Sequence, residues 1–222
     1  MDTPLYKVYL LRRLPSYYQA QPEDINALRS AMASHQRELG VRDLFNGGTA
    51  WSNERYEFFG VEFYPNLNAV QEYTRRLMEL KFYQYFDTES YLGIPMDNSF
   101  PDFNFEPPCP GDCAVYRLYF SRSSPLAALT PKETRDDILM RVQETAHSMG
   151  ISTILSAYMR WNNESWDYFG VERFPNMETL IGYSQFLTEI DWYSQSQAAS
   201  YLGYALGGLA AGMEDLANPQ LP

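Results

Sequence analysis

The stretch WSNERYEFFGVEFYPN, residues 51–66, decides the fold because the chain repeats it as WNNESWDYFGVERFPN at residues 161–176. Nine of the 16 positions are identical, and residue 161 of the second stretch corresponds to residue 51 of the first. A register without gaps that extends over about 90 residues predicts two copies of one domain. The same offset pairs further residues: Tyr6 with Tyr116, Arg12 with Arg122, Gly40 with Gly150 and Tyr91 with Tyr201.

Each copy has the pattern of a ferredoxin-like βαββαβ unit. In the first copy a short apolar and aromatic run at 6–12 predicts a strand, and a helix is predicted from Pro22 to Gly40. Strands over 41–51 and 55–64 form a predicted hairpin that turns at Ser52-Asn53. Asn66 is a predicted N-cap for a helix to about residue 81, and a last strand is predicted near 83–92.

The repeat and a proline-rich stretch set the domain boundaries. We predict a first unit at 1–96, a linker at 97–113, a second unit at 114–206 and a C-terminal tail at 207–222. A unit with helices on one sheet face must cover its other face. The two units are therefore expected to pack sheet to sheet, as an α+β barrel within one molecule.

The layout and the W-x-N-E…F-G-V-E-x-(F/Y)-P-N stretch resemble the dimeric α+β barrel superfamily. The resemblance is greatest to small bacterial single-copy proteins of unknown function that end in a similar Leu-Gly strand, which would make this chain a tandem two-copy member. Members of the superfamily include cofactor-free monooxygenases, polyketide cyclases, haem-degrading enzymes and muconolactone isomerases. The resemblance thus implies a fold and leaves the function open.

Composition excludes several classes of partner. Seventeen Lys and Arg against 28 Asp and Glu give a net charge of −11, which repels phosphate backbones and anionic lipid. No apolar run approaches the roughly 18 residues of a membrane span, and no signal peptide is visible, so a cytoplasmic protein is expected. Cys109 and Cys113 form a lone C-x3-C, which is a poor zinc site.

Aromatic residues make up 16% of the chain, with 18 tyrosines. They fit either an aromatic core or a pocket for a flat apolar ligand. We take the following as candidate substrate-binding residues: Trp51, Tyr6, Tyr73, Tyr91, Trp161, Trp166 and Glu172.

His35 follows Ile25, Leu28 and Met32 at helical spacing, which places it on the buried stripe of the first predicted helix. The second copy has Thr145 at that position. An imidazole there is a buried structural histidine, a general base or, as a third alternative, a haem ligand.

Period-two alternation places Glu62 on an aromatic face with Tyr56, and Glu172 on the matching face of the second copy. A carboxylate among aromatic rings needs a partner, and Arg12 and Arg122 are the candidates. The pairs are either structural ion pairs or acid–base groups. The candidate catalytic residues are His35, Glu62, Tyr56 and Arg12.

No phosphate loop, dinucleotide fingerprint, nucleophile elbow or zinc-protease motif is present. Our sequence-based hypothesis is a cofactor-independent cyclase or isomerase that acts on an aromatic or polyketide-like molecule of natural-product biosynthesis, with no metal. The alternatives are a cofactor-free monooxygenase and a non-catalytic binding protein. We expect a monomer, or a dimer through outer surfaces, with the working site in the first copy.

Overall fold

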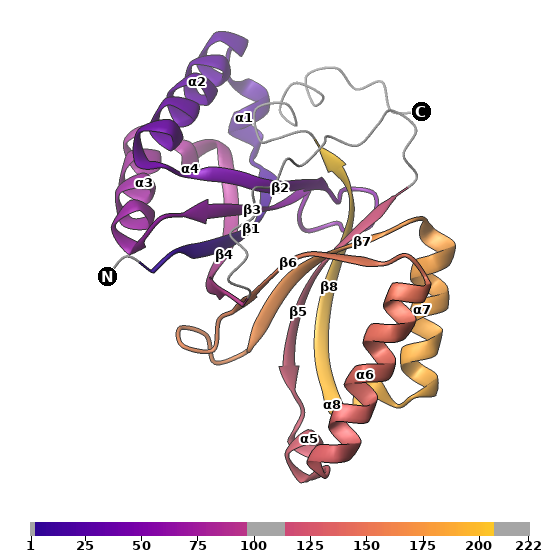
Figure 1. The fold of residues 1–222 in the computed structure, drawn as a ribbon. Coiled ribbons are helices and arrows are strands. Elements are labelled where there is room, and N and C mark those ends of the chain that lie inside the picture. Colours follow the sequence, from indigo (N-terminus) through magenta and orange to yellow (C-terminus); the bar gives the residue numbers. More distant parts are fainter. Residues whose placement is uncertain (1–2, 97–113, 207–222) are drawn as a thin grey trace.

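The computed structural model describes residues 3–96 and 114–206, which we call the first half and the second half (Figure 1). The predicted linker at 97–113, with Cys109 and Cys113, and the predicted tail at 207–222 lie outside the described residues. No helix in the described part of the chain is long and apolar enough to cross a membrane.

The elements of the first half follow in the order βααββααβ. They are β1 (Leu5–Arg13), α1 (Pro15–Gln19), α2 (Pro22–Leu39), β2 (Arg42–Gly48), β3 (Phe58–Tyr64), α3 (Leu67–Glu79), α4 (Phe82–Tyr85) and β4 (Phe86–Pro95).

The second half repeats this order. Its elements are β5 (Val115–Ser123), α5 (Pro125–Leu129), α6 (Lys132–Ser148), β6 (Ser152–Tyr158), β7 (Tyr168–Phe174), α7 (Met177–Glu189), α8 (Trp192–Gln195) and β8 (Ser196–Leu206).

The eight strands close into one antiparallel barrel in the order β1-β3-β2-β8-β5-β7-β6-β4. The halves join where β2 pairs with β8 and where β4 pairs with β6. The helices lie outside the barrel, those of the first half on one side and those of the second half on the other (Figure 1). The predicted α+β class is therefore confirmed.

Three clusters of buried side chains hold these layers together. The first fills the barrel interior with residues from both halves, so the interior is a packed core. The second lies between the first-half sheet and α2, α3 and α4, and the third, much smaller, lies under α6 and α7. The helix layer of the second half is thus the less tightly packed one.

Local sequence signals explain where the helices begin and end. The Asn66 side chain accepts a hydrogen bond from the Ala69 amide at 2.9 Å, as predicted for an N-cap, and Asn176 does the same for Thr179 at 2.8 Å. Gly40 ends α2 with a φ of 69°, which favours glycine.

Two predicted boundaries were wrong. The hairpin between β2 and β3 does not turn at Ser52-Asn53 alone, because the strands end at Gly48 and begin again at Phe58. The last strand of the half begins at Phe86, since residues 82–85 form the short helix α4. Lys81 precedes that helix in the left-handed region, with a φ of 57°, and turns the chain back toward the sheet.

Candidate functional site

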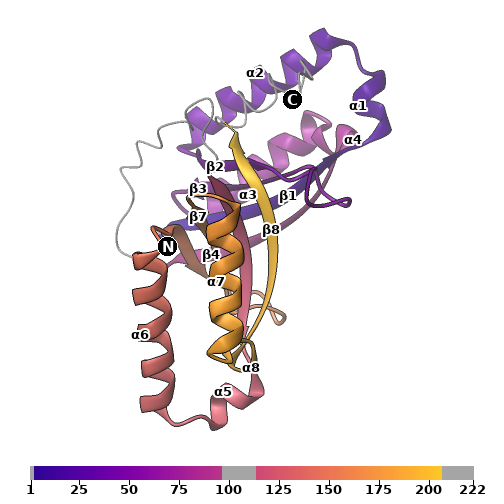
Figure 2. The same ribbon diagram turned by 90° about the vertical axis from the view of Figure 1, so that its right-hand side faces the viewer.

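The second half contains an open cavity of about 550 Å³ between α6 and the sheet, which we call the α6 cleft. This volume lies within the range of small-molecule pockets, about 300–1,000 Å³. Figure 2 shows α6 and α7 next to each other on the outer side of this half, with α5 at their lower end. The cleft is lined by Met96, Ser121, Arg122, Ser123, Ala127, Lys132, Arg135, Asp136, Ile138, Leu139, Tyr168, Trp192, Gln195 and Ser196.

The corresponding region of the first half is filled. Ile25, Leu28 and Met32 of α2 are all buried there. A cavity of about 30 Å³ elsewhere in this half is lined by Met32 and by neither Ile25 nor Leu28. Helix α6, in contrast, has no buried residue, and its Leu139 side chain is 46% exposed. The space that core side chains occupy in the first half is therefore open in the second half.

One difference in sequence between the two halves accounts for part of this difference in packing. Arg135 occupies the repeat position at which the first half buries the aliphatic side chain of Ile25. A guanidinium cannot be packed against the sheet without a costly loss of hydration. Arg135 stays exposed and lines the cleft, so α6 cannot seat on the sheet as α2 does.

Three cations give the α6 cleft a positive side in an otherwise acidic protein. Lys132 pairs with Asp136 at 2.5 Å, and the Arg122 Nε donates to the Gln197 side chain at 2.7 Å. The Arg135 guanidinium makes no hydrogen bond or ion pair with any described residue. Arg122 and Arg135 therefore keep charge available for an anion, while Ile138, Leu139 and Trp192 supply apolar surface.

Glu62 lies outside this cleft, buried in the first half between the sheet and α2. It accepts hydrogen bonds from the Tyr64 hydroxyl at 2.6 Å and from the Gln36 side chain at 3.4 Å. Lys7 stands opposite Glu62 on β1. The predicted partner Arg12 was wrong, because Arg12 pairs with Asp87 on β4 at 2.8 Å.

Glu172, the matching carboxylate in the second half, has a different partner. The Arg117 guanidinium donates to Glu172 from Nε at 2.8 Å and from Nη2 at 2.5 Å, with both side chains largely buried. Arg122, the partner predicted for Glu172, lines the α6 cleft instead. Arg117 also lies over the Phe174 ring, 5.0 Å from its centroid.

Tyr56 and Tyr91 meet at a carboxylate that sequence reasoning missed. Both hydroxyls donate to Glu89 of β4, and Arg55 lies 3.4 Å from it. Burial opposes ionisation of Glu89, but the two phenols and the guanidinium together hold its pKa below the ordinary value. Burial in turn raises the pKa of Tyr56 and of Tyr91. The available signal was the period-two alternation that places Glu89 and Tyr91 on one face of the strand, the same pattern that singled out Glu62.

Neither histidine of the chain lines the α6 cleft. His35 is half-buried where α2 meets α3, with its Nδ1 3.0 Å from Arg76 Nη1, so its predicted place on the sheet-facing stripe was wrong. His147 is exposed in the last turn of α6. It is eight residues beyond Leu139, a rise of about 12 Å along the helix.

The other predicted binding residues do not gather at one pocket. Tyr6, Tyr56, Tyr91 and Trp166 belong to the packed barrel interior. Tyr73 is buried between α3 and the sheet and borders the 30 Å³ cavity with Glu62. Trp51 and Trp161 are exposed in the two β-turn regions, where Trp51 stacks on Tyr204 at 5.2 Å.

The turn regions themselves join the halves. Ser52 Oγ donates to the Leu202 carbonyl at 2.6 Å, and Asn162 Nδ2 donates to the Leu92 carbonyl at 3.0 Å. Ser52 and Asn162 are equivalent positions of the repeat, as are Leu92 and Leu202. The two bonds are reciprocal, so these turns tie the two halves of the barrel together.

Comparison with known proteins establishes the fold of this chain and does not assign it to a family. No described protein family matches the sequence, and no curated protein matches it either. Solved structures match over nearly the whole chain. A protein provisionally named chlorite dismutase has 14% identity and a TM-score of 0.71, and the match covers 99% of this chain and 100% of that one.

Two further structures are similar. A mutant chlorite dismutase from Candidatus Nitrospira defluvii has 7% identity and a TM-score of 0.78, with 98% of each chain covered. A haem-binding protein from Thermus thermophilus has 11% identity and a TM-score of 0.69, with 97% of this chain and 95% of that one covered. At these identities the likeness establishes the ferredoxin-like α+β fold that these proteins share.

These neighbours correct the predicted function. The hypothesis of a cofactor-independent cyclase or isomerase of natural-product biosynthesis was wrong, as were its alternatives, a cofactor-free monooxygenase and a non-catalytic binding protein. The structures that share the whole fold are those of chlorite dismutases and of a haem-binding protein.

A haem group needs apolar surface for its ring, cations for its carboxylates and, commonly, an axial ligand for its iron. The α6 cleft provides the first two. It provides no imidazole, since both histidines lie elsewhere, and the described residues contain no cluster of three or more His, Cys, Asp or Glu that could hold a metal. The residues fit a porphyrin ring and its carboxylates but do not fit a histidine-ligated haem iron.

Proposed function

We propose that the second half of this protein binds a porphyrin-type ligand, a flat apolar ring with carboxylate side chains, in the α6 cleft. The observation that carries the proposal is the 550 Å³ cavity in which Arg122 and Arg135 face apolar side chains. Guanidinium groups bind carboxylates through two parallel hydrogen bonds, so they recognise acid groups at the edge of a ring.

The shape of the cleft supports the same class of ligand. Ile138 and Leu139 on α6 and the rings of Tyr168 and Trp192 offer apolar and aromatic surface to a ligand between helix and sheet. The net charge of −11 would repel an anion in general, so a local group of cations is the feature that selects one. The haem-binding protein from Thermus thermophilus, which shares the fold, supports the same class of ligand.

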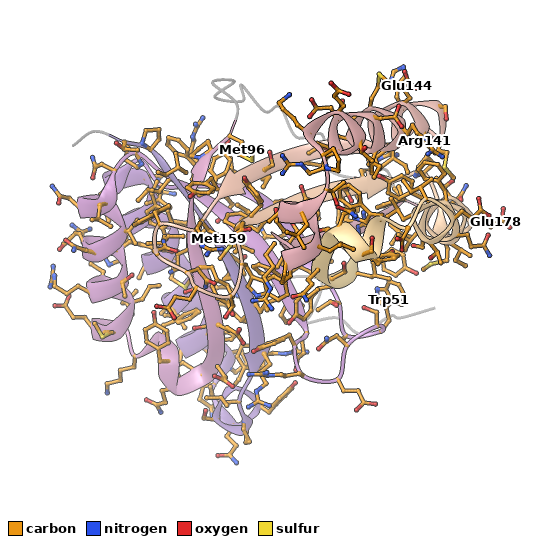
Figure 3. All side chains as sticks on the ribbon, turned by 90° about the horizontal axis from the view of Figure 1, so that it is seen from below. Trp51, Met96, Arg141, Glu144, Met159 and Glu178 are labelled. Atoms are coloured by element: carbon orange, nitrogen blue, oxygen red, sulfur yellow. The ribbon has the colours of Figure 1, made fainter. Side chains whose placement is uncertain are left out.

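The test compares protoporphyrin IX with its dimethyl ester, which has the same ring and no free carboxylate. We expect the diacid to bind at least tenfold more tightly, measured by quenching of tryptophan fluorescence and by the porphyrin absorbance shift. The variant Arg135→Gln, which removes the charge and keeps a polar side chain, should lose most of this preference. Arg141→Gln is the matched control, because Arg141 is exposed on the same helix and does not line the cleft (Figure 3). Equal binding of diacid and diester would contradict the proposal.

We also infer that the chain is a tandem pair of βαββαβ units. Strand pairing supports this, because Leu5 pairs with Tyr64 and, at the equivalent positions of the second copy, Val115 pairs with Phe174. The register shifts in β2 between Asp43 and Phe45 and in β6 between Thr153 and Leu155, again at equivalent positions. Since the barrel closes within one chain, a monomer in solution is the expected state, and light scattering measures it.

A further inference from the structure

We propose that the α6 cleft recognises the porphyrin ring and its carboxylates and is indifferent to the metal at the ring centre. Metal-free porphyrins are then ligands as good as haem. The inference rests on the proposed function and makes the ligand class more specific.

The first argument is the position of the imidazoles. The only two histidines are His35, held against Arg76 in the first half, and His147, exposed beyond the cleft. A ring seated among Ile138, Leu139 and Trp192 lies close to neither of them. Iron bound there gains no imidazole ligand, and therefore adds none of the affinity that such a bond supplies.

The second argument concerns the other possible donors in the cleft. The Lys132 amine is held at 2.5 Å from Asp136 and is charged, so it has no lone pair to offer a metal. Met96 lies at the rim, 53% exposed, where its amide donates to the Ser156 carbonyl (Figure 3). The Tyr168 ring packs against Tyr158, with centroids 5.6 Å apart. Among the described residues, no His or Cys side chain lines the cleft, and the Asp136 carboxylate is engaged by Lys132.

The third argument concerns the contacts that would hold the ligand in the cleft. Arg122 and Arg135 contact carboxylates and not a ring centre, and the apolar side chains contact the ring faces whatever the centre holds. The binding free energy then comes from terms that metal-free and metal-bound rings share. Discrimination between them needs a contact with the metal itself.

The test measures the affinity of the whole protein for protoporphyrin IX, for zinc protoporphyrin IX and for haemin under the same conditions. We expect the three dissociation constants to agree within about threefold, since a tenfold difference needs about 1.4 kcal/mol of extra interaction. The absorption spectrum of the haemin complex should lack the bands of imidazole-ligated iron. His35→Ala and His147→Ala should leave haemin affinity unchanged.

The possible outcomes distinguish failure of this inference from failure of the proposed function. If haemin binds more than tenfold tighter than the metal-free ring, the metal is recognised and this inference is wrong, while porphyrin binding stands. Tyr168→Phe and Met96→Leu would then identify the ligating side chain by removing the preference. If none of the three rings binds, the proposed function fails and the inference falls with it.

Discussion

Ile25 and Arg135 occupy equivalent positions of the repeat and begin the inner faces of α2 and α6, but only Ile25 is buried. Around Ile25 the helix is seated on the sheet, with Ile25, Leu28 and Met32 all buried. Around Arg135 the helix stands away and leaves about 550 Å³. The exchange of an aliphatic side chain for a cation thus coincides with the difference between a packed layer and a cleft. Exchanges of large for small side chains accompany it, such as Leu11 for Ser121 and Phe86 for Ser196.

This relationship predicts an asymmetric response to exchanging the two residues. Ile25→Arg places an unpaired charge in a filled layer and should lower the free energy of unfolding by about 3 kcal/mol. Arg135→Ile removes an exposed charge and should change it by less than about 0.5 kcal/mol. Urea unfolding followed by circular dichroism measures both. Equal losses in the two variants would mean that α6 is packed as tightly as α2.

The predicted fold followed from the repeat, because one constant register between the copies constrains both halves at once. The strands, the long helices and the Asn66 cap could be read from periodicity and end signals. Residues 82–85 could not, since α4 is a single turn and its Tyr and Phe residues also suit a strand.

The candidate site was less predictable, because its residues depend on which elements are neighbours in space. Strand β1, which carries Arg12, has β3 on one side and β4 on the other, and sequence alone did not indicate that Arg12 pairs with Asp87 of β4 rather than with Glu62 of β3. His35 follows the apolar spacing of α2, yet it lies at the edge that faces α3. The cleft did have a signal, namely Arg135 at the position of Ile25.

The pair Arg117–Glu172 predicts a strong coupling in the second half. Glu172→Gln leaves a largely buried guanidinium without its anion, and should cost about 2–4 kcal/mol of stability. The double variant Arg117→Met with Glu172→Met should recover at least half of that loss, because no charge remains unpaired. A double-mutant cycle in urea, with Arg117→Met as the second single variant, measures the coupling. Additive losses would show that the two side chains act independently.

Two buried tyrosines in the first half should respond differently to loss of the hydroxyl. The Tyr64 hydroxyl donates to Glu62 at 2.6 Å, so Tyr64→Phe leaves that carboxylate short of a partner and should cost about 1.5–3 kcal/mol. The Tyr73 hydroxyl is buried and has no hydrogen-bond partner among the described residues. Tyr73→Phe should therefore be neutral or stabilising by up to about 1 kcal/mol.

Thermal unfolding of the two variants at one pH compares them directly. Tyr64 and Tyr73 lie in the same layer with ring centroids 6.1 Å apart, so each serves as the control for a phenol lost from this environment. A Tyr73→Phe variant that melts as early as Tyr64→Phe would place a hydrogen bond on the Tyr73 hydroxyl.

The surroundings of Glu89 lead us to expect that the folded protein loses stability in acid. Its carboxylate is partly desolvated, yet the hydroxyls of Tyr56 and Tyr91 and the charge of Arg55 favour its ionised form and lower its folded-state pKa. A group with a lowered folded-state pKa contributes stability that is present above its unfolded-state pKa, which is near 4.3 for Glu. That contribution is lost as the pH falls toward and through the folded-state value. Glu89→Gln keeps the size of the side chain and removes the titration.

At pH 7 we expect Glu89→Gln to be less stable than the parent by about 1–2 kcal/mol, since hydrogen bonds to a charged acceptor are replaced by weaker ones. Below about pH 4 the two proteins should converge, because the parent carboxyl is then increasingly protonated. Unfolding free energies measured from pH 3 to pH 8 in urea give the difference directly. Arg12 pairs with Asp87 on the same strand, so Asp87→Asn is the control for a partly exposed carboxylate without phenol donors. If the Glu89→Gln difference were constant across this range, as large at pH 3 as at pH 7, the phenol donors would not be stabilising a charge.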